Sequence, residues 1–439
     1  FCKTEEVVLV GDIPKSDWKV QRYLYTRDIS SAPLITLLLK YVDEIYQPRN
    51  EEEVMEILKM AKQEGATVIP RGAGTSGYGG VLPVKDIALF RFSSRKTIMI
   101  DTTRMDSFEI NEDEQIVECS PGAVWWDIEK KLNKKGLTLR IYPTSAPSST
   151  VAGWIAQNGT GVGSLKYGGI AENVTKIRVA DFNGVKEVEG KDLKYYVGMC
   201  GTTGIITKAW VKVKEVEDMH YYAFHLPPHK AGKLVYEGEH YAALYLDEGY
   251  VKLKNQSFGT NLPEKDTLMI ATTEKMSEGD EELGEEIWET RFYPMRVRKL
   301  GPGLVAAENV LPVDSIPAYL NALHRMVKQP NGSEIWYVKG KKGAVLTFIP
   351  SDERKFLNYA LTWRQSLRAL RTAKKMRGVP YSLGLYLSCE SKLLLKQDYE
   401  EIREFKKKID PEDLLNPGKV FPKGVFPLII GIGQKVVIL

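Results

Sequence analysis

The feature that most restricts the fold is a glycine-rich loop that directly follows a short apolar stretch. Residues 67–70 (TVIP) predict a strand, and residues 71–80 (RGAGTSGYGG) contain five glycines. Glycine adopts positive φ without a steric penalty, so successive backbone N–H groups can point into one concavity and bind a diphosphate. The hydroxyls of Thr75 and Ser76 add donors. Taken alone, the loop is equally compatible with a flexible surface turn.

Two common phosphate-binding motifs do not fit this loop. No Gly-Lys-Ser/Thr follows it, so it is not a Walker loop. The glycine spacing also differs from the dinucleotide-binding fingerprint, and no helix clearly opens on the loop. A different diphosphate-binding fold is therefore indicated.

Three further stretches occur in a fixed order after the first loop. Residues 143–154 (PTSAPSSTVAGW) lead into a run of glycines up to residue 169, residues 198–207 read GMCGTTGIIT, and residues 416–420 read NPGKV. Long ordered loops of this composition usually carry function. Together, the four stretches resemble the PCMH-type FAD-binding domain of the vanillyl-alcohol oxidase superfamily. The nearest branch resembles the D-lactate dehydrogenase and glycolate oxidase flavoprotein subunits. The resemblance covers residues 36–215 and 386–421 well and the intervening region only weakly.

The resemblance implies a set of FAD-binding residues in the four stretches. The first loop would wrap the diphosphate, the second would line the flavin and ribityl side, the third would meet the adenine or the ring edge, and the last would return near the isoalloxazine. These residues are Arg71, Gly72, Ala73, Gly74, Thr75, Ser76, Gly77, Tyr78, Gly79, Gly80, Pro143, Thr144, Ser148, Ser149, Thr150, Gly153, Gly159, Gly201, Gly204, Ile206, Asn416 and Lys419. Some relatives tether FAD through a histidine in the first loop. Thr75 and Ser76 stand there instead, so we expect non-covalent FAD.

The expected fold class is α+β, with a two-lobed FAD-binding domain and a separate α+β substrate or cap domain. Helical spacing with an acidic first turn predicts a helix after Asn50 that ends at Gly65, and the texture of the sequence changes after about Val216. We expect an N-terminal extension (1–35), the FAD-binding domain (36–216), the cap domain (217–385), a returning segment (386–422) and an apolar tail (423–439). Residues 85–96 are longer than the family's usual connection and predict a surface hairpin.

Composition excludes several classes of protein. The 439 residues are 43% hydrophobic with a net charge of +4, which is ample for packed domains and gives no concentrated basic face for nucleic acid. The four cysteines are scattered, so no zinc ribbon or iron–sulfur motif is encoded, and a reducing compartment is favoured. No stretch reaches the ~20 apolar residues that span a bilayer.

We expect a cytoplasmic protein, with peripheral membrane association through a partner as an alternative. The apolar tail is equally compatible with a partner-docking segment and a packed strand.

The substrate region is less informative. Related 2-hydroxy-acid dehydrogenases bind the substrate carboxylate through an arginine before an apolar strand, and Arg291 is the candidate here, because guanidinium pairs bidentately with carboxylates. A surface arginine on a helix is an equally compatible interpretation, and Arg296, Arg298 and Lys299 lie nearby and could substitute for Arg291. The histidine-rich metal motif of many relatives is replaced by residues 337–345 (YVKGKKGAV), and a lysine of the family falls near Ala306. We therefore predict no metal site. A general base is unassigned, with Tyr337, Lys339 and Tyr386 as weak candidates.

Two functional hypotheses follow from this pattern. The first is an FAD-dependent dehydrogenase of a small 2-hydroxy acid, of the D-lactate or glycolate kind, which passes electrons to a protein acceptor. The second is a flavin electron-transfer subunit of a larger iron–sulfur complex. Relatives often use an iron–sulfur partner, and this sequence has no cluster motif of its own, so we expect an iron–sulfur protein or another electron-acceptor subunit as the partner.

Overall fold

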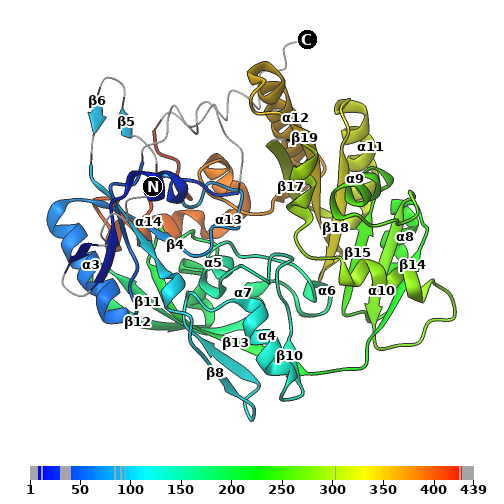
Figure 1. The fold of residues 1–439 in the computed structure, drawn as a ribbon, viewed down its shortest axis with the longest axis horizontal. Coiled ribbons are helices and arrows are strands. Elements are labelled where there is room, and N and C mark those ends of the chain that lie inside the picture. Colours follow the sequence, from blue (N-terminus) through cyan, green and yellow to red (C-terminus); the bar gives the residue numbers. More distant parts are fainter. Residues whose placement is uncertain are drawn as a thin grey trace, which may run out of the picture.

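The computed structural model describes residues 8–10, 13–29, 41–83, 86–88, 91–93, 95–301, 303–424 and 427. The predicted N-terminal extension and the predicted hairpin at 85–96 lie partly outside these residues, and most of the apolar tail lies outside them. Within the described part, the chain forms three main sheets (Figure 1).

The first sheet carries the glycine-rich loop at the end of one of its parallel strands. Its strand order is β1-β2-β3-β7-β4, and β3 and β4 both run parallel to β7. Its strands are β1 (Val8–Val10), β2 (Ile13–Ser16), β3 (Glu44–Tyr46), β4 (Thr67–Arg71) and β7 (Thr97–Asp101), and its helices are α1 (Lys19–Tyr25) and α3 (Glu51–Glu64). As predicted, the side chain of Asn50 caps α3 by accepting from the N–H of Glu53, and Gly65 ends the helix in the left-handed region. Between β4 and β7, strands β5 (Asp86–Ala88) and β6 (Arg91–Ser93) pair antiparallel.

The second sheet is antiparallel and carries the next two loops. Its order is β12-β11-β13-β9-β8, and β10 pairs with β13. The strands are β8 (Phe108–Asn111), β9 (Ile116–Cys119), β10 (Leu137–Leu139), β11 (Val174–Asp181), β12 (Gly184–Glu189) and β13 (Ile205–Glu215), and the helices are α4 (Trp125–Asn133), α5 (Val151–Ile155), α6 (Ser164–Tyr167) and α7 (Ile170–Asn173). The two sheets are joined across α3, where Glu51 pairs with Arg178 at 2.6 Å and accepts from the hydroxyl of Thr207.

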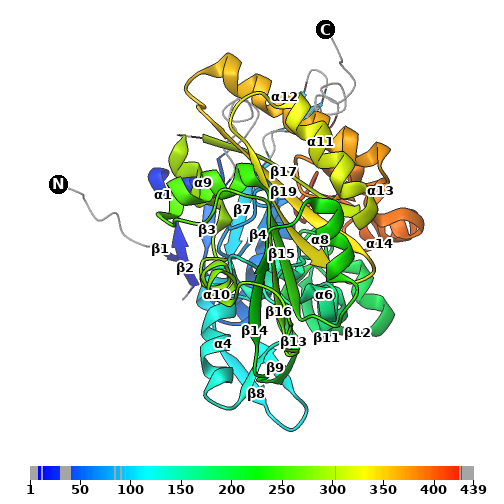
Figure 2. The same cartoon turned by 90° about the vertical axis from the view of Figure 1, so that its right-hand side faces the viewer.

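The third sheet forms a separate layer on the right of Figure 1 and faces the viewer in Figure 2. Its order is β14-β16-β15-β18-β19-β17-β20. The strands are β14 (His220–Phe224), β15 (Ala242–Leu246), β16 (Thr267–Thr272), β17 (Gly303–Pro312), β18 (Gly332–Val338), β19 (Lys342–Ser351) and β20 (Val379–Pro380), and the helices are α8 (Pro228–Val235), α9 (Glu248–Phe258), α10 (Glu281–Glu289), α11 (Ile316–Met326) and α12 (Phe356–Lys375).

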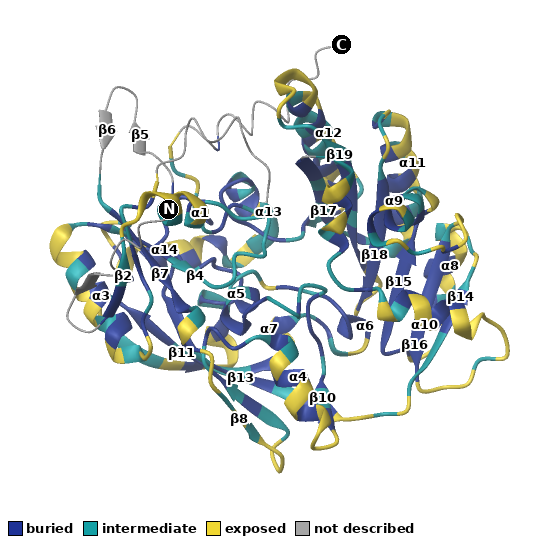
Figure 3. Cartoon of the chain, viewed as in Figure 1, coloured by how far each residue is buried: buried dark blue, intermediate teal, exposed yellow. Residues whose placement is uncertain are grey.

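The two faces of the third sheet have different environments. Side chains such as Ile335, Tyr337 and Leu311 form one apolar core with α8, α11 and α12. Trp336 and Phe348 belong instead to the core that includes the second sheet. One face of this sheet is therefore covered by its own helices, and the other is turned toward the first half of the molecule. Exposed residues gather on the outer helices and loops (Figure 3).

The chain finally returns to the first sheet. After α13 (Ser391–Leu395) and α14 (Tyr399–Ile409), Leu415 forms a parallel bridge to Val68 of β4. The predicted α+β class and two-domain arrangement are confirmed. β13 ends at Glu215 and the next strand begins at His220, so we keep 36–216, 217–385 and 386–422 as proposed boundaries.

Candidate functional site

A large cavity lies between the first half of the molecule and the third sheet. Its volume is about 500 Å³, within the usual range for small-molecule and cofactor sites. The first, second and third glycine-containing stretches all contribute to its wall, as do β17, β18 and the segment after β20. It is lined by almost all of the predicted cofactor residues, namely Arg71, Gly72, Ala73, Gly74, Thr75, Ser76, Gly77, Tyr78, Gly80, Pro143, Thr144, Ser148, Ser149, Thr150, Gly153, Gly201, Gly204 and Ile206.

The loop at 71–80 presents unpaired backbone donors to this cavity. Among the described residues, no backbone N–H from Gly72 to Tyr78 donates to a protein acceptor. Gly74 has φ +69° and Gly79 has φ +75°, which only glycine adopts without strain. The N–H of Gly79 is held by the Asp28 carboxylate at 2.7 Å, which fixes the end of the loop. The remaining donors form a cradle for an anionic group.

The second loop packs directly against the first. A Cβ added at Gly72 would lie 2.1 Å from the Thr150 hydroxyl oxygen, so the two loops meet without space for a side chain. The hydroxyl oxygens of Ser149 and Thr150 are both buried and have no protein partner. Since buried polar atoms are normally hydrogen-bonded, these hydroxyls indicate a polar ligand that contacts them. A diphosphate fits these donors.

Arg71 is the one cation that lines the cavity among the described residues. Its guanidinium donates to the carbonyl of Arg27 at 2.8 Å and lies over the Tyr25 ring at 5.2 Å. Burial lowers the pKa of Arg71, while nearby Asp101 opposes that shift. The guanidinium stays charged, because arginine side chains are not deprotonated in proteins.

Gln157 connects three segments that border the cavity. Its amide oxygen accepts from Ser76 at 3.3 Å and from Ser382 at 2.8 Å, and its amide nitrogen lies 3.5 Å from the sulfur of Cys200. The first loop, the third stretch and the segment after β20 thus share one side chain.

Asn416 holds the first and third stretches together from behind. Its side-chain nitrogen donates to the carbonyl of Gly80 at 2.9 Å and to that of Cys200 at 2.6 Å. Asn416 is fully buried and does not line the cavity, so it acts on the site through the loops that it joins.

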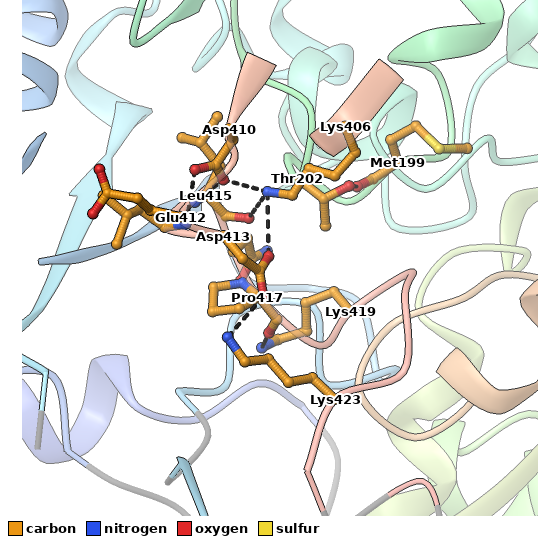
Figure 4. Close-up of polar contacts among 12 residues, drawn as sticks. Met199, Thr202, Lys406, Asp410, Glu412, Asp413, Leu415, Pro417, Lys419 and Lys423 are labelled. Carbon is orange, nitrogen blue, oxygen red and sulfur yellow. Dashed lines mark hydrogen bonds and ion pairs between the residues drawn. The ribbon is translucent and has the colours of Figure 1, made fainter. Parts of the chain in front are cut away.

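A buried ion pair positions the backbone around Asn416 (Figure 4). Lys406 pairs with Asp410 and donates to the carbonyl of Leu415 at 2.9 Å, and the Asp410 carboxylate accepts from the N–H groups of Leu414 and Leu415. The charges and the backbone groups are therefore mutually satisfied, as a buried ion pair requires.

Lys419 is buried beside this segment, near the sulfur of Cys200. It is 1% exposed, and burial lowers its pKa to about 7. Burial raises the pKa of the Cys200 thiol to about 12, with Lys419 opposing the shift, so Cys200 is a neutral thiol. Lys419 does not line the cavity.

The far wall of the cavity is the face of the third sheet that is turned toward the first half of the molecule. Glu308 of β17 and Glu334 of β18 are both aligned with Leu346 of β19, so the three residues form one row across the sheet. Both glutamates, Leu346 and Trp336 line the cavity. Burial raises the pKa of each carboxyl to about 7. This end of the cavity is therefore acidic and aromatic, unlike the glycine-rich end.

Tyr78 connects the two ends of the cavity. It belongs to the first loop, and its hydroxyl donates to Glu308 of β17. The Tyr78 ring stacks on that of Tyr381, with centroids 6.2 Å apart, and the Tyr381 hydroxyl donates to the carbonyl of Thr160 at 2.7 Å. Glu308 is thus held by a residue of the loop that forms the cradle.

Arg291 does not line the cavity. It is 8% exposed, and its guanidinium donates to the Tyr142 hydroxyl at 2.9 Å and to the carbonyl of Trp288. Its guanidinium carbon lies 4.0 Å from the centre of a Trp288 ring and 4.3 Å from that of Phe292. In this arrangement its donors are directed to protein acceptors.

Four predicted cofactor residues are also absent from the cavity wall: Gly79, Gly159, Asn416 and Lys419. Gly159 instead leaves space for Trp154, whose indole nitrogen would lie 1.8 Å from a Cβ there. Of the three candidate bases, Tyr386 lines the cavity, Tyr337 packs on the helix-covered face, and Lys339 pairs with Glu172 at 3.1 Å.

Sequence reasoning missed the acidic end of the site. Glu308 and Glu334 each stand in an otherwise largely apolar strand, LVAAENVLP and GSEIWYV. A carboxylate inside such a strand is rarely buried without a role, and that signal was available. Among the described residues, no group of three histidine, cysteine or acidic side chains could hold a metal. The part of the chain that the structure describes also has no helix long and apolar enough to cross a membrane.

Comparison with known proteins agrees with this geometry. Residues 42–188 match the family model described as an FAD binding domain. The chain is 23% identical over 417 residues to D-lactate dehydrogenase of Archaeoglobus fulgidus, which covers 86% of this chain and 91% of that protein. It is 32% identical over 181 residues to glycolate oxidase subunit GlcD of Bacillus subtilis, over 39% of this chain and 37% of that subunit.

The fold is also similar to a solved structure. An alkyldihydroxyacetonephosphate synthase structure superposes with a TM-score of 0.71 at 22% identity, covering 92% of this chain and 83% of that chain. The cradle, the unpaired hydroxyls and the match to the FAD binding domain agree on one cofactor. Residues 42–188 carry an FAD-binding domain, the chain is an FAD-dependent oxidoreductase, and it is similar to D-lactate dehydrogenase and to glycolate oxidase subunit GlcD.

Proposed function

We propose that this protein dehydrogenates a small 2-hydroxy acid at a cavity shared by FAD and substrate. The observation that carries the proposal is the division of one cavity into a glycine-rich end with unpaired donors and an acidic, aromatic end on the third sheet. The first end fits the FAD diphosphate, so the second is left for substrate. The names of the two relatives, D-lactate dehydrogenase and glycolate oxidase subunit GlcD, support this substrate class.

The residues of the first end would hold FAD without a covalent bond. The backbone donors of 72–78 and the hydroxyls of Ser149 and Thr150 would bind the diphosphate and nearby oxygens, and Arg71 would offset the negative charge. No histidine lines the cavity among the described residues, and the lining cysteine, Cys200, is a neutral thiol with little nucleophilicity. When bound, FAD supplies the two-electron acceptor for oxidation of the substrate.

The protein residues would orient the reactants and exclude water. The cavity wall includes large apolar surfaces from Trp154, Trp336 and Leu346. An apolar wall excludes water, which strengthens electrostatic interactions inside the cavity. The substrate carboxylate has no free cation on the cavity wall, since Arg71 is the one lining cation among the described residues. Arg291 remains the proposed carboxylate partner only if it leaves the Tyr142 hydroxyl when substrate binds.

The test is anaerobic mixing of the FAD-loaded protein with D-lactate, L-lactate and glycolate in turn, with the oxidised flavin absorbance as readout. Bleaching by one of them supports the proposal and identifies its substrate. If the yellow protein is not bleached by any, the hydroxy-acid assignment is wrong while the cofactor assignment stands. Arg291→Lys then separates two roles. A carboxylate partner gives a raised KM with little change in Tm, and a purely structural role gives a lower Tm with an unchanged KM.

The absence of the family's metal-binding histidines favours a second candidate, a flavin electron-transfer subunit of an iron–sulfur complex. The described residues contain no metal-ligand group, and Arg291 is occupied by Tyr142. Both candidates use an iron–sulfur acceptor protein, and we propose a cytoplasmic location with membrane contact only through such a partner. Co-purification with a cysteine-rich protein, together with no bleaching by hydroxy acids, would favour this second function.

A further inference from the structure

We propose that Glu308 is the general base of this site and accepts the hydroxyl proton of the substrate. The inference rests on the proposed function, because it needs an alcohol at the acidic end of the cavity. It assigns the general base, which the sequence alone leaves unassigned, and it is drawn from the position of Glu308 in the fold.

Three parts of the chain converge on Glu308. The residue lies on β17 and lines the cavity on the face of the third sheet that is turned toward the first half of the molecule. Tyr78 reaches it from the cofactor loop, and Tyr381 stacks on Tyr78 from the segment after β20. Because Tyr78 belongs to the loop that wraps the diphosphate, its hydrogen bond places Glu308 where the cofactor-binding and substrate-binding ends of the cavity meet.

The surroundings of Glu308 suit a base better than a structural ion pair. Among the described residues, no lysine, arginine or histidine forms an ion pair with it, and its one side-chain donor is Tyr78. The titratable groups facing it are Tyr78, Tyr381 and, across one strand, Glu334, which is roughly 10 Å away by the spacing of neighbouring strands. Burial raises the pKa of Glu308 to about 7, so the carboxylate form is available at neutral pH and can accept a proton there.

The proposed step balances as follows. The substrate O–H bond breaks and its proton passes to a Glu308 oxygen. The C–H bond on the same carbon breaks, and that hydrogen leaves with its electron pair to the oxidised FAD. The substrate becomes a carbonyl compound, the flavin is reduced by two electrons, and Glu308 later releases its proton to water.

The first experiment measures anaerobic flavin reduction by the hydroxy acid that bleaches the wild-type FAD-loaded protein. Glu308→Gln should slow the reduction by about 100-fold or more, with little change in substrate Kd, and should abolish its rise with pH around pH 7. Tyr78→Phe removes a hydrogen bond that favours the carboxylate, so the midpoint should move up by about one pH unit. A merely structural role for Glu308 would not move this profile. Reduction of Glu308→Gln at the wild-type rate with the wild-type pH profile overturns the proposal.

A matched control comes from Glu129, a second glutamate whose pKa is raised by burial. It does not line the cavity, and its carboxylate accepts from the hydroxyl of Thr138 and from the N–H of Leu139. Glu129→Gln should retain the pH profile of flavin reduction. If Glu129→Gln also lost the pH dependence of flavin reduction, the loss in Glu308→Gln would reflect general destabilisation, and the proposal would be overturned.

A second experiment needs no substrate, so it tests the role of Glu308 separately from the proposed hydroxy-acid activity. Infrared difference spectra of the FAD-loaded protein across a pH titration report the C=O stretch of protonated carboxyl groups. Glu308 and Glu334 both have a pKa of about 7, so both contribute to a band that titrates near pH 7. We expect this band in the wild type and in Glu129→Gln, and a band that has lost the Glu308 contribution in Glu308→Gln. If no hydroxy acid bleaches the flavin, the proposed substrate class is wrong, and the difference between the wild-type and Glu308→Gln bands still judges Glu308. A smaller band in Glu308→Gln supports an available base, and an unchanged band overturns the proposal.

Discussion

The two ends of the cavity are built on different principles. At the cofactor end, the ligand-facing groups are backbone N–H groups and small hydroxyls of loops that are each continuous in sequence. At the acidic end, they are side chains such as Glu308, Glu334 and Tyr381, brought together by strand register and by the segment after β20. The first arrangement offers many backbone donors from neighbouring positions, whereas the second depends on a few side chains that single substitutions can change.

The largest expected effect comes from the buried Lys406–Asp410 ion pair, which positions the backbone behind the cofactor end of the cavity. Lys406→Met leaves Asp410 buried without its cation and should lower the free energy of unfolding by about 3–5 kcal/mol. Chemical unfolding followed by fluorescence measures it. Lys406→Met combined with Asp410→Asn should recover part of the loss. Lys423→Ala breaks the more exposed pair with Asp413 and should cost about 0.5 kcal/mol or less.

A smaller effect tests the cradle itself. Gly72→Ala places a Cβ 2.1 Å from the Thr150 hydroxyl oxygen and should cost about 2–3 kcal/mol of FAD binding, or roughly a 100-fold higher Kd. Quenching of FAD fluorescence on titration with the apoprotein measures the Kd. Gly77→Ala in the same loop is the matched control, because the nearest atom to its new Cβ is 3.7 Å away. Equal Kd values for the two variants would show that the loops can separate freely.

The smallest expected effect is a gain in stability rather than a loss, and it comes from Glu308 at the acidic end. The pKa of Glu308 is raised by burial, so between about pH 4.5 and 7 the folded protein binds more protons than the unfolded one, and stability falls as pH rises. Because glutamine does not ionise, Glu308→Gln removes the free-energy cost of ionising this carboxyl in the folded protein. The variant should be more stable than the wild type at pH 7.5 by about 1–2 kcal/mol, although we expect it to slow catalysis. Thermal unfolding of both proteins at pH 5 and pH 7.5 measures it. A variant less stable than the wild type at pH 7.5 would contradict this account.

The same contrast explains what the sequence could predict. The helix from Asn50 to Gly65 and the glycine-rich loop depend on neighbouring residues, so local rules recover them. The loops at 143–154 and 198–207 were recognisable through their resemblance to a known FAD-binding domain, and residues of both line the cavity. Glu308 and Glu334 share a row only because both align with Leu346, and one sequence does not reveal that register. Arg291 was chosen from a family pattern, which does not show that Tyr142 accepts its hydrogen bond.

The contact of Asn416 with Gly80 and Cys200 also bears on the order in which the protein assembles. It joins carbonyls that lie 336 and 216 residues earlier in the chain. During synthesis, both glycine-containing stretches leave the ribosome long before the residue that holds them together. The nascent chain therefore carries an unfinished cofactor site through most of its translation, and tight FAD uptake should begin only after residue 416 emerges. Because a ligand that binds only the native state stabilises it, FAD then favours the completed fold over its precursors.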